Sequence, residues 1–526
     1  MTDPILITGA GPTGLTAALE LSRMGVPVRL IDKRAAPATT SRAIGVQART
    51  LELFRQRGLA DEMVRLGNKG RFGSVYGGGK RVFHLDFAHV ESPFPYLLFI
   101  SQAETERILR DACAREGIKP EWSVELVAFR QDALSHDPSP FHAVLRHRDG
   151  RLGEVAAPWM ISAEGTRSIA RTTLDLPFEG HTREEQYALG DIRIDGDLAD
   201  TDFHIFSSEH GFMGLFPMGG DHFRLIASNP LSTPEKDPAP SLEEIQRIYD
   251  MRSHIPARFH DCVWSSWFRI NSRMVSRVKA GRIFLGGDAA HIHSPAGAQG
   301  MNTGIQDMIN LCWKLALVLK GQAPPALLDT YGEDRLPAMR NVLSQTDSLT
   351  TTIGTENPVV RTLFNHLGPW VVGTGIVQAS ATAGMSQIAL DYRDSPLSDS
   401  HHTGGSLRAG DRVPDVPVRL GQGDGWREAT LHEALDPSRF TLLVHALDDG
   451  NHRVDRSAFP PDSIVSWLIT ASTDGARDAL DGILGRGSAT LVRPDGYAAL
   501  TTSLATAPAH LGAWCAKWRP PSPRRR

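Results

Sequence analysis

Two short apolar runs near the start of the chain are separated by a segment with helical spacing. Residues 4–8 (PILIT) predict a buried strand, and residues 15–25 carry apolar side chains at helical intervals. A second run, residues 28–31, ends on Asp32. The order strand, helix, strand and acidic residue indicates the first half of a βαβ unit.

A comparable change of pattern occurs past the middle of the chain. The apolar run 283–285 stops at Gly286-Gly287-Asp288, and a loop rich in Gly, Pro and Ala follows. A helix is then predicted from about Asn302, because apolar residues recur with helical spacing. These residues are Ile305, Met308, Ile309, Cys312, Leu315, Ala316 and Leu319.

The remaining segments differ in their pattern of apolar and polar residues, which suggests how the chain is divided into domains. Residues 124–129, 142–146 and 154–161 alternate in polarity and predict antiparallel strands. The polar stretch 395–410 is a linker candidate. We expect a discontinuous first domain of residues 1–175 and 275–345, into which an α+β domain of residues 176–274 is inserted. A helical connector, residues 346–400, leads to a C-terminal α/β domain, residues 401–526.

Composition limits the class of protein. The chain has 526 residues, 41% hydrophobic and 22% charged, which is enough for about three ordinary globular domains. A net charge of −4 gives no signature of nucleic-acid or membrane-surface binding. Four scattered cysteines without a CxxC motif argue against a metal site or disulfide framework. With no signal peptide and no apolar run of transmembrane length, we expect a cytoplasmic protein.

The first loop carries a dinucleotide fingerprint. Gly9-Ala10-Gly11-Pro12-Thr13-Gly14 fits G-x-G-x-x-G between a strand and a helix. In such loops the glycines permit a tight turn, the close approach of a pyrophosphate and tight helix packing, while an acid about 20 residues later binds a ribose. Asp32 stands at that distance. A plain βαβ unit is the alternative, but the complete order of elements favours cofactor binding.

Other polar residues fit the same interpretation. Arg42 lies where its guanidinium can reach two phosphate oxygens, although a surface arginine is the alternative. Gln102 follows Ser101, a predicted N-cap, and is either a helix-start residue or a cofactor contact. For His291 and His293 we favour local hydrogen bonding over any catalytic role.

With these motifs together, the chain resembles the flavin-dependent aromatic hydroxylases of the p-hydroxybenzoate hydroxylase type, the group A flavoprotein monooxygenases. Its layout is most similar to that of the larger phenol and polyketide hydroxylases. The resemblance implies an α/β fold with a Rossmann-like FAD-binding domain, an inserted α+β substrate domain and a C-terminal thioredoxin-like domain. It also implies FAD, NADPH or NADH as reductant, and O2 as co-substrate.

The resemblance assigns roles to individual positions. It places the FAD pyrophosphate at the first glycine motif, the adenosine ribose at Asp32 beside Lys33, and the ribityl chain at Asp288. Arg42 and Gln102 match further FAD contacts. The loop beside the isoalloxazine ring matches Pro295, Gly297, Gln299, Gly300, Met301 and Asn302, with Pro295 on the side of the ring where oxygen is transferred.

Two features depart from the family pattern. The family usually shows Gly-Ala-Asp-Gly, whereas this chain has Ser162-Ala163-Glu164-Gly165, so the longer acid changes the reach of the carboxylate. Because the family links this motif to both FAD and the nicotinamide cofactor, the choice between NADH and NADPH stays open. The C-terminal domain lacks CxxC and cannot carry dithiol chemistry, which favours a structural or oligomerisation role.

The family chemistry implies hydroxylation of a phenolic or polyketide-type aromatic substrate through a flavin C4a-hydroperoxide. We expect a small-molecule partner, no nucleic acid and no membrane, with a homodimer as one assembly. Other flavin oxygen chemistry (epoxidation, Baeyer–Villiger oxidation, antibiotic inactivation) and a catalytically silent aromatic-binding flavoprotein stay open. Six residues of the inserted domain are substrate-site candidates, each with an ordinary structural alternative: Arg193, His204, Phe206, Phe216, Met218 and Arg224.

Overall fold

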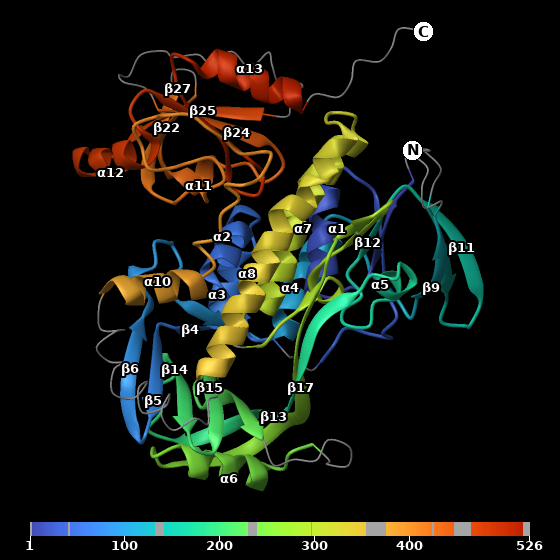
Figure 1. Cartoon of the computed structure of the whole chain (residues 1–526), viewed down its shortest axis with the longest axis vertical. Coiled ribbons are helices and arrows are strands. Elements are labelled where there is room, and N and C mark those ends of the chain that lie inside the picture. Colours follow the sequence, from blue (N-terminus) through green and yellow to red (C-terminus); the bar gives the residue numbers. More distant parts are fainter. Residues whose placement is uncertain are drawn as a thin grey trace.

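The computed structural model is described here for residues 3–39, 43–131, 141–229, 239–295, 297–353, 375–422, 425–445 and 464–518. Three regions follow one another along the long axis of the molecule (Figure 1). A central α/β body lies between a β-sheet at one end and a C-terminal α/β domain at the other. No helix within these ranges is long and apolar enough to cross a membrane.

A six-stranded sheet forms the centre of the body. Its strands, in spatial order, are β18 (Lys279–Ala280), β19 (Ile283–Leu285), β12 (Met160–Ser162), β1 (Ile5–Thr8), β2 (Val28–Asp32) and β8 (Glu121–Trp122). The strands from β19 to β8 are all parallel. Both predicted motifs therefore end at the same edge of one sheet, because β1 and β19 run in the same direction.

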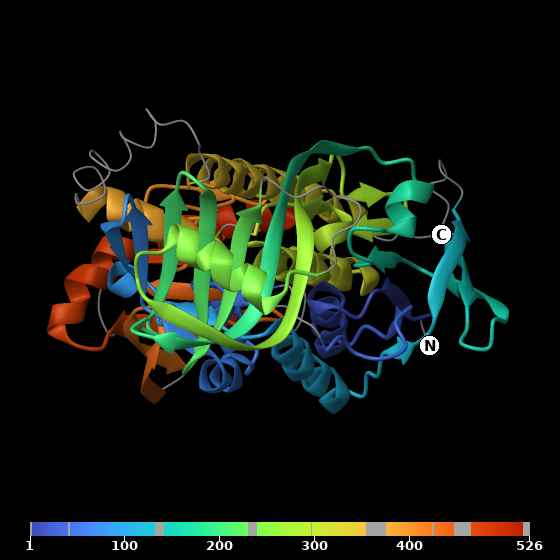
Figure 2. The same cartoon turned by 90° about the horizontal axis from the view of Figure 1, so that it is seen from below.

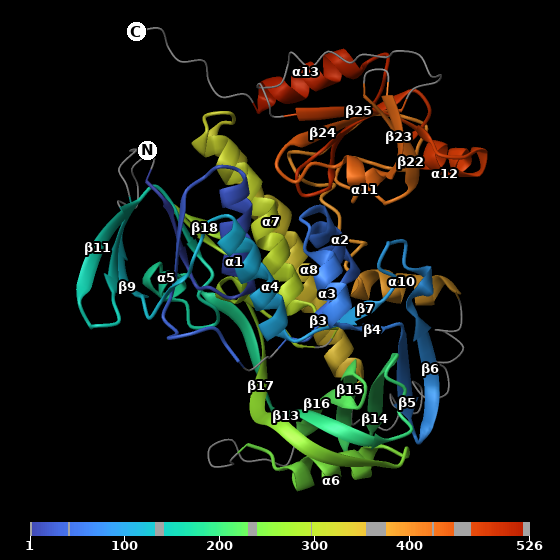
Figure 3. The ribbon, with the colours of Figure 1, turned by 180° about the vertical axis from the view of Figure 1, so that it is seen from behind.

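Two layers cover this sheet, as strand alternation requires. Ile5 and Ile7 point into the larger core, which also holds three helices that lie side by side in Figures 1 and 3: α1 (Pro12–Arg23), α4 (Gln102–Arg115) and α7 (Gly300–Leu319). Leu6 and Ile31 point the opposite way, toward a three-stranded antiparallel sheet. That sheet consists of β9 (Glu125–Arg130), β10 (Phe141–Arg146) and β11 (Leu152–Ala157), as predicted.

An eight-stranded sheet forms one end of the molecule. Its spatial order is β20 (His291–Ile292), β17 (Ala257–Val275), β13 (Phe178–Gly196), β16 (His222–Asn229), β15 (Gly211–Gly219), β14 (Asp202–Ser208), β5 (Phe72–Gly77) and β6 (Lys80–Asp86). Helix α6 (Leu242–Arg252) crosses its outer face (Figure 2). Ile245, Ile248 and Tyr249 of α6 pack there against Leu215 and Leu225.

Strands β5 and β6 come from the segment that the sequence assigned to the first domain. They join the far edge of the large sheet through the parallel pair β14 and β5. The alternation of residues 80–86 is visible in the sequence, but a strand pattern does not reveal its partner. Three short strands connect this hairpin to the central body: β3 (Gly45–Val46), β7 (Leu97–Phe99) and β4 (Asn68–Gly70).

The remaining elements of the body are short helices and two longer ones. They are α2 (Ala48–Gln56), α3 (Ala60–Leu66), η1 (Phe87–His89), α5 (Ile169–Thr173), η2 (Gly287–Ala289), η3 (Pro325–Leu328), α8 (Thr330–Ile353) and α10 (Gly375–Met385). Helices α8 and α10 fall in or border the predicted connector, and residues 354–374 between them lie outside the described ranges.

The C-terminal domain holds a seven-stranded mixed sheet. Its order is β21 (Asp399–Ser400), β27 (Ala498–Ser503), β26 (Ser488–Val492), β24 (Phe440–His445), β25 (Ile464–Ala471), β22 (Pro417–Gln422) and β23 (Gly425–Thr430), accompanied by α11 (Leu431–Ala434), α12 (Asp474–Leu484) and α13 (Ala507–Lys517). This is the expected α/β domain. Its thioredoxin-like relationship and the limits of all four segments stay predictions.

Buried charges join the C-terminal domain to the body. Arg493 and Lys314 both donate to one carboxylate oxygen of Asp334, at 2.9 and 2.7 Å, and all three side chains are fully buried. Arg49 of α2 donates to the carbonyl of Asp495 at 2.7 Å. A buried ion pair is costly to break by removing one partner, so this network fixes how the domain docks.

Candidate active site

The three glycines of the first motif have different structural surroundings. Gly9 has a φ of +101°, and a Cβ there would collide with the carbonyl of Ala163, which follows β12. A Cβ on Gly14 would collide with the Gly9 carbonyl. At Gly11, in contrast, an added Cβ meets no atom within 4 Å. Two glycines thus serve packing within the protein, while Gly11 leaves open backbone where a ligand can approach.

Two helix N-termini meet beside this open backbone. Neither α1, which begins at Pro12, nor α7, which begins at Gly300, has a side-chain cap at its N-terminus. Their first N–H groups are therefore available to an anion. Thr13 of α1 packs closely against Gly287 of η2 and Gly304 of α7. This approach requires glycine at both positions, because a Cβ on either one would collide with the hydroxyl of Thr13. The two motifs, almost 300 residues apart in sequence, thus form one site.

Asp32 lies at the carboxyl end of β2 and is nearly buried. Its carboxylate accepts a hydrogen bond from the Ala10 N–H at 2.8 Å, which ties it to the glycine loop. Arg34 donates to both carboxylate oxygens, at 3.1 and 3.0 Å. Lys33 points to solvent and is exposed. Sequence reasoning missed Arg34, since one cation among several after a strand carries no pattern.

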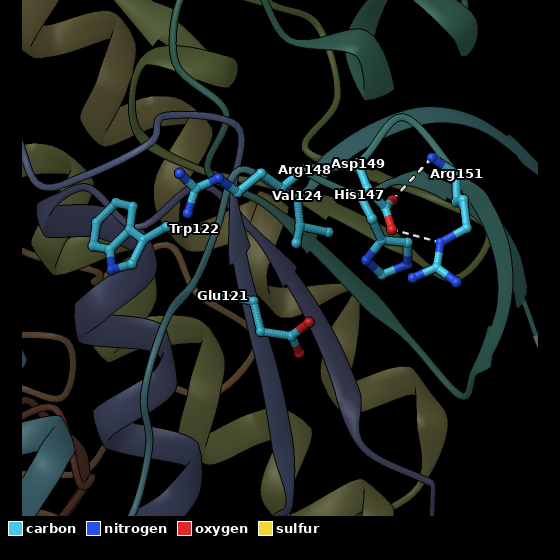
Figure 4. A pocket seen from close by; sticks show the side chains of 7 residues that line it. All are labelled: Glu121, Trp122, Val124, His147, Arg148, Asp149 and Arg151. Atoms are coloured by element: carbon cyan, nitrogen blue, oxygen red, sulfur yellow. Dashed lines mark hydrogen bonds and ion pairs between the residues drawn. The ribbon is translucent and has the colours of Figure 1, made fainter.

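A shallow cavity of about 690 Å³ lies beside the Asp32 end of the sheet (Figure 4). It is lined by Trp122 of β8, which pairs with Asp32, and by residues of the β10–β11 turn. The Arg34 guanidinium lies over the Trp122 ring, 5.7 Å from its centre. The close-up separates Trp122 from the Asp149–Arg151 ion pair on the other side of the cavity. Flat and cationic groups therefore flank the ribose-binding end of the motif.

Gln102 and Glu106 lie on the first turns of α4 near this end. The side chain of Gln102 donates to Glu106 at 2.9 Å and accepts from the Ala43 N–H at 3.2 Å. Burial raises the pKa of the Glu106 carboxyl. The predicted contact Arg42 lies outside the described residues, one position before Ala43. Gln102 thus anchors Ala43, the residue that follows Arg42 in the sequence.

Asp288 lies in the short helix η2, immediately after the central strand β19. Its side chain is exposed, whereas its neighbours Gly287 and Ala289 are buried. The Gly287 N–H donates to Asp307 of α7 at 3.1 Å, so the turn is held by the helix that follows it. An accessible carboxylate on a fixed turn suits a chain of sugar hydroxyl groups.

The segment from Pro295 to Asn302, called the Pro295–Asn302 loop below, ends in the first turn of α7, and its described residues 295 and 297–302 are held by side chains that turn inward. Gln47 donates to the carbonyl of Gly297 at 2.5 Å, and Ala298 adopts a positive φ of +53°. The Asn302 amide is fully buried and bonded to Gly45, Gln47 and Ala298. Asn302 therefore shapes the loop through bonds to protein, and the loop offers backbone and the half-buried Pro295 to a ligand. Gln47 was not identified from the sequence.

Behind this loop two histidines stack with ring centres 5.8 Å apart. His291 shares a 2.8 Å hydrogen bond with Asp307, which also accepts from Arg335 at 2.8 Å. The favoured interpretation of His291 as a local hydrogen-bonding residue is confirmed. His293 is buried beside Gly300, and burial lowers its pKa to about 3, so its imidazole is neutral at ordinary pH.

Glu164, the departure from the family motif, has a structural role here. One of its carboxylate oxygens accepts hydrogen bonds from Ser162 at 2.9 Å, Ser168 at 2.7 Å and the Ala170 N–H at 3.0 Å. These donors lie at the start of α5 and the end of β12. The longer acid thus reaches back to cap a helix, where a negative charge is also favoured by the helix dipole.

The substrate candidates divide between the two faces of the large sheet. Phe216 packs against Phe99 of the central body, with ring centres 5.9 Å apart, and Met218 joins the same core. Arg224 pairs with Phe216 across the strands, so it shares the inner face, but both Asp191 oxygens bind it at 2.6 Å. Its charge is therefore neutralised.

Two other candidates are not on the inner face. Phe206 packs against Tyr249 on the α6 side, and His204 stacks in the same row, 6.5 Å from Phe206. Burial lowers the pKa of His204. Arg193 lies two residues after Asp191 on β13 and therefore on the same face as Asp191, half exposed and paired with Asp221. Residue type does not reveal the face of a strand, which depends on its register, and a substrate-binding role for these three residues stays a prediction.

A chain of contacts links the inner face of the large sheet to the Pro295–Asn302 loop. Gly45 touches Ala298 of the loop and pairs with Phe99, which in turn contacts Phe216 and Phe203. Further along the sheet, this face carries half-buried aromatic side chains that the sequence did not single out: Phe212, Trp264 and Phe268. This face of the sheet thus carries a row of aromatic side chains, which is linked to the loop through Phe216, Phe99 and Gly45.

These features fit FAD. Gly11 leaves room for the pyrophosphate, two uncapped helix N-termini offer donors, Asp32 and Asp288 stand at opposite ends, and the Pro295–Asn302 loop supplies a backbone surface for a flat ring. The distribution of anionic and N–H groups matches a cofactor with sugar hydroxyl groups at two places and phosphates between them.

Comparison with known proteins agrees with this geometry. Residues 2–346 match a family model described as an FAD binding domain. The 6-methylpretetramide 4-monooxygenase of Streptomyces rimosus is 34% identical over 521 residues, covering 94% of this chain and 90% of the relative. The pentachlorophenol 4-monooxygenase of Sphingobium chlorophenolicum is 33% identical, with 84% and 79% covered.

The solved structures show the same architecture over nearly the whole chain. The anhydrotetracycline hydroxylase OxyS from Streptomyces rimosus matches with a TM-score of 0.78 and 29% identity, covering 99% of this chain and 100% of that one. Family model, relatives and fold agree on a protein that binds FAD and belongs among the monooxygenases. The chain therefore belongs to the FAD-binding-domain family of flavin-dependent aromatic monooxygenases.

Proposed function

We propose that this FAD-dependent monooxygenase hydroxylates a polycyclic phenol of the polyketide type, using NADPH or NADH as reductant and O2 as co-substrate. The observation that carries the proposal is the aromatic inner face of the large sheet, which is linked to the Pro295–Asn302 loop. Phe212, Phe216 and Trp264 are half-buried there, which leaves ring surface for a flat ligand. Aromatic side chains favour offset stacking on such ligands.

Residues of this chain supply position and electrostatics. When bound, FAD supplies the oxygen activation that side chains lack. The uncapped N-terminus of α7 would stabilise negative charge on the bound ring system, and Pro295 would lie on the substrate side of the ring. Because Asp191 neutralises Arg224, the aromatic inner face rather than a free cation selects the substrate.

The test is a panel of one-ring, two-ring and four-ring phenols with the purified holoenzyme. We expect four-ring phenols to stimulate NADPH or NADH oxidation and to gain one oxygen atom. With 18O-labelled O2, the mass of the product should show that this atom comes from O2. Phe216→Leu should raise KM for a four-ring phenol about 2- to 12-fold, the equivalent of 0.5–1.5 kcal/mol of lost stacking. Phe129→Leu, in the separate three-stranded sheet β9–β10–β11, is the matched control and should leave KM unchanged.

Oxidation that yields only hydrogen peroxide with every compound in the panel would contradict the proposal. A product with an inserted ring oxygen or an epoxide would replace it by another flavin oxygen reaction. The capping role of Glu164 removes the feature that favoured a silent flavoprotein. A cytoplasmic location, supported by the free cysteines among the described residues, and a homodimer stay predictions.

A further inference from the structure

A second cavity, of about 300 Å³, lies on the outer face of the large sheet. It is lined by the turn after β5, by the end of β14 and by the C-terminal end of α6. Phe206 contributes to its wall and belongs to the core on the α6 side, so the sheet separates this cavity from the aromatic inner face. The mechanism proposed above uses none of its residues.

The most unusual residue of this cavity is Arg252, at the last position of α6. Its side chain is only 5% exposed. Its terminal nitrogens donate to the carbonyls of Phe212 at 2.8 Å, Ser228 at 2.6 Å and His210. Within the described residues, no carboxylate lies within ion-pair distance of it, and its Nε has no hydrogen-bond partner.

A buried arginine without a carboxylate is unfavourable, because burial costs a charged group several kcal/mol unless an opposite charge compensates it. Burial accordingly lowers the pKa of Arg252 to about 10. Neutral carbonyl groups satisfy only part of the guanidinium. The rim carboxylate Glu209 lies 3.8 Å from His210 rather than on the arginine. The site therefore holds a positive charge that an incoming anion can neutralise.

The remaining walls specify the kind of anion. Tyr76 stacks on Phe206 with ring centres 4.8 Å apart and an angle of 12° between the rings. Both line the cavity, together with Met251, which is 47% exposed although it is a large hydrophobic residue. Ligand cavities start at about 300 Å³, so this one has room for one or two fused rings.

We propose that this cavity is a second binding site, specific for a small aromatic carboxylate of one or two rings. The carboxylate pairs with Arg252, and the rings lie against Tyr76 and Met251. Inorganic phosphate would satisfy the charge but not the apolar walls, which is why an aromatic anion is favoured.

The test is calorimetric titration of the holoenzyme with 2-naphthoate, and in parallel with the neutral 2-naphthamide and with inorganic phosphate. We expect 2-naphthoate to bind at least 10-fold more tightly than either of the other two. Met251→Glu places a negative charge at the rim without touching the bonds of Arg252, and should weaken 2-naphthoate binding at least 10-fold. Met251→Gln, the neutral control, should change Kd less than Met251→Glu does, by no more than threefold.

Arg252→Met should abolish binding, and Arg252→Lys should retain part of it. Should Arg252→Met fail to fold, the Met251 pair still decides, because those variants leave every bond of Arg252 in place. The proposal is overturned by the absence of 2-naphthoate binding or by equal affinity in the Met251→Glu and Met251→Gln proteins. Equal affinity for the amide, or phosphate binding as tight as that of 2-naphthoate, also overturns it.

Discussion

The different surroundings of Gly11 and Gly14 lead to opposite effects of the same substitution. In Gly11→Ala the new methyl group meets no protein atom within 4 Å, and the φ of −82° is accessible to alanine. Restricting the unfolded chain stabilises by about 0.4–1 kcal/mol, while alanine is a poorer N-cap than glycine by a similar amount. We expect the free energy of unfolding of the apoprotein to change by less than about 1 kcal/mol.

FAD binding should nevertheless suffer in Gly11→Ala. The methyl group fills the space through which a pyrophosphate reaches the N–H groups of α1. The loss of one charge-assisted hydrogen bond costs about 1.5–3 kcal/mol, which raises Kd roughly 10- to 150-fold. Gly14→Ala should instead lower the free energy of unfolding of the apoprotein, because its Cβ overlaps the Gly9 carbonyl and forces the backbone apart. Overpacking of this kind costs about 1–3 kcal/mol.

Two measurements separate these effects. Quenching of flavin fluorescence on titration with apoprotein gives Kd for FAD, and urea unfolding of the apoprotein gives the free energy of unfolding. Gly475→Ala, a second open glycine far away on α12, controls for the substitution itself and should leave Kd unchanged. The reasoning is refuted if Gly11→Ala binds FAD within twofold of the natural protein, or if its apoprotein loses more than about 2 kcal/mol.

Two further predictions concern buried charge. The folded pKa of His293, about 3, lies below the unfolded value near 6.5, so stability should fall as pH drops from 6.5 toward 3, by up to about 1.4 kcal/mol per pH unit. In urea unfolding, His293→Gln should remove this part of the pH dependence of the free energy of unfolding, whereas the exposed control His181→Gln should keep it. Equal pH dependence in the natural protein and both variants would disprove the assignment to His293. Asp334→Asn leaves Lys314 buried without its counter-charge, while Arg493 keeps only Asp495, and should cost about 3–5 kcal/mol in the same assay. A loss below about 1 kcal/mol would show that the network does not hold the domains together.

Much of the cofactor site was predictable because its signals are local. The glycine motif and Asp288 each follow a strand and precede a helix, and Asp32 ends a strand, so their place at the edge of a parallel sheet follows from chain order and strand pattern. Helix α7 and strands β9 to β11 were likewise visible as periodicity. The sequence missed Gln47 because it acts on a loop 250 residues away, and Arg34 because one cation after a strand carries no pattern.

Periodicity by itself determined which segments become strands and helices, and the motifs determined which cofactor they hold. Only the tertiary structure decided which side of the large sheet each residue occupies. His204 and Phe206 face α6 while Phe216 faces the site, because strand pairing sets the register and a shift of one residue reverses every side chain. The same packing buried Arg252 without a carboxylate partner among the described residues, a result that no spacing along the chain records.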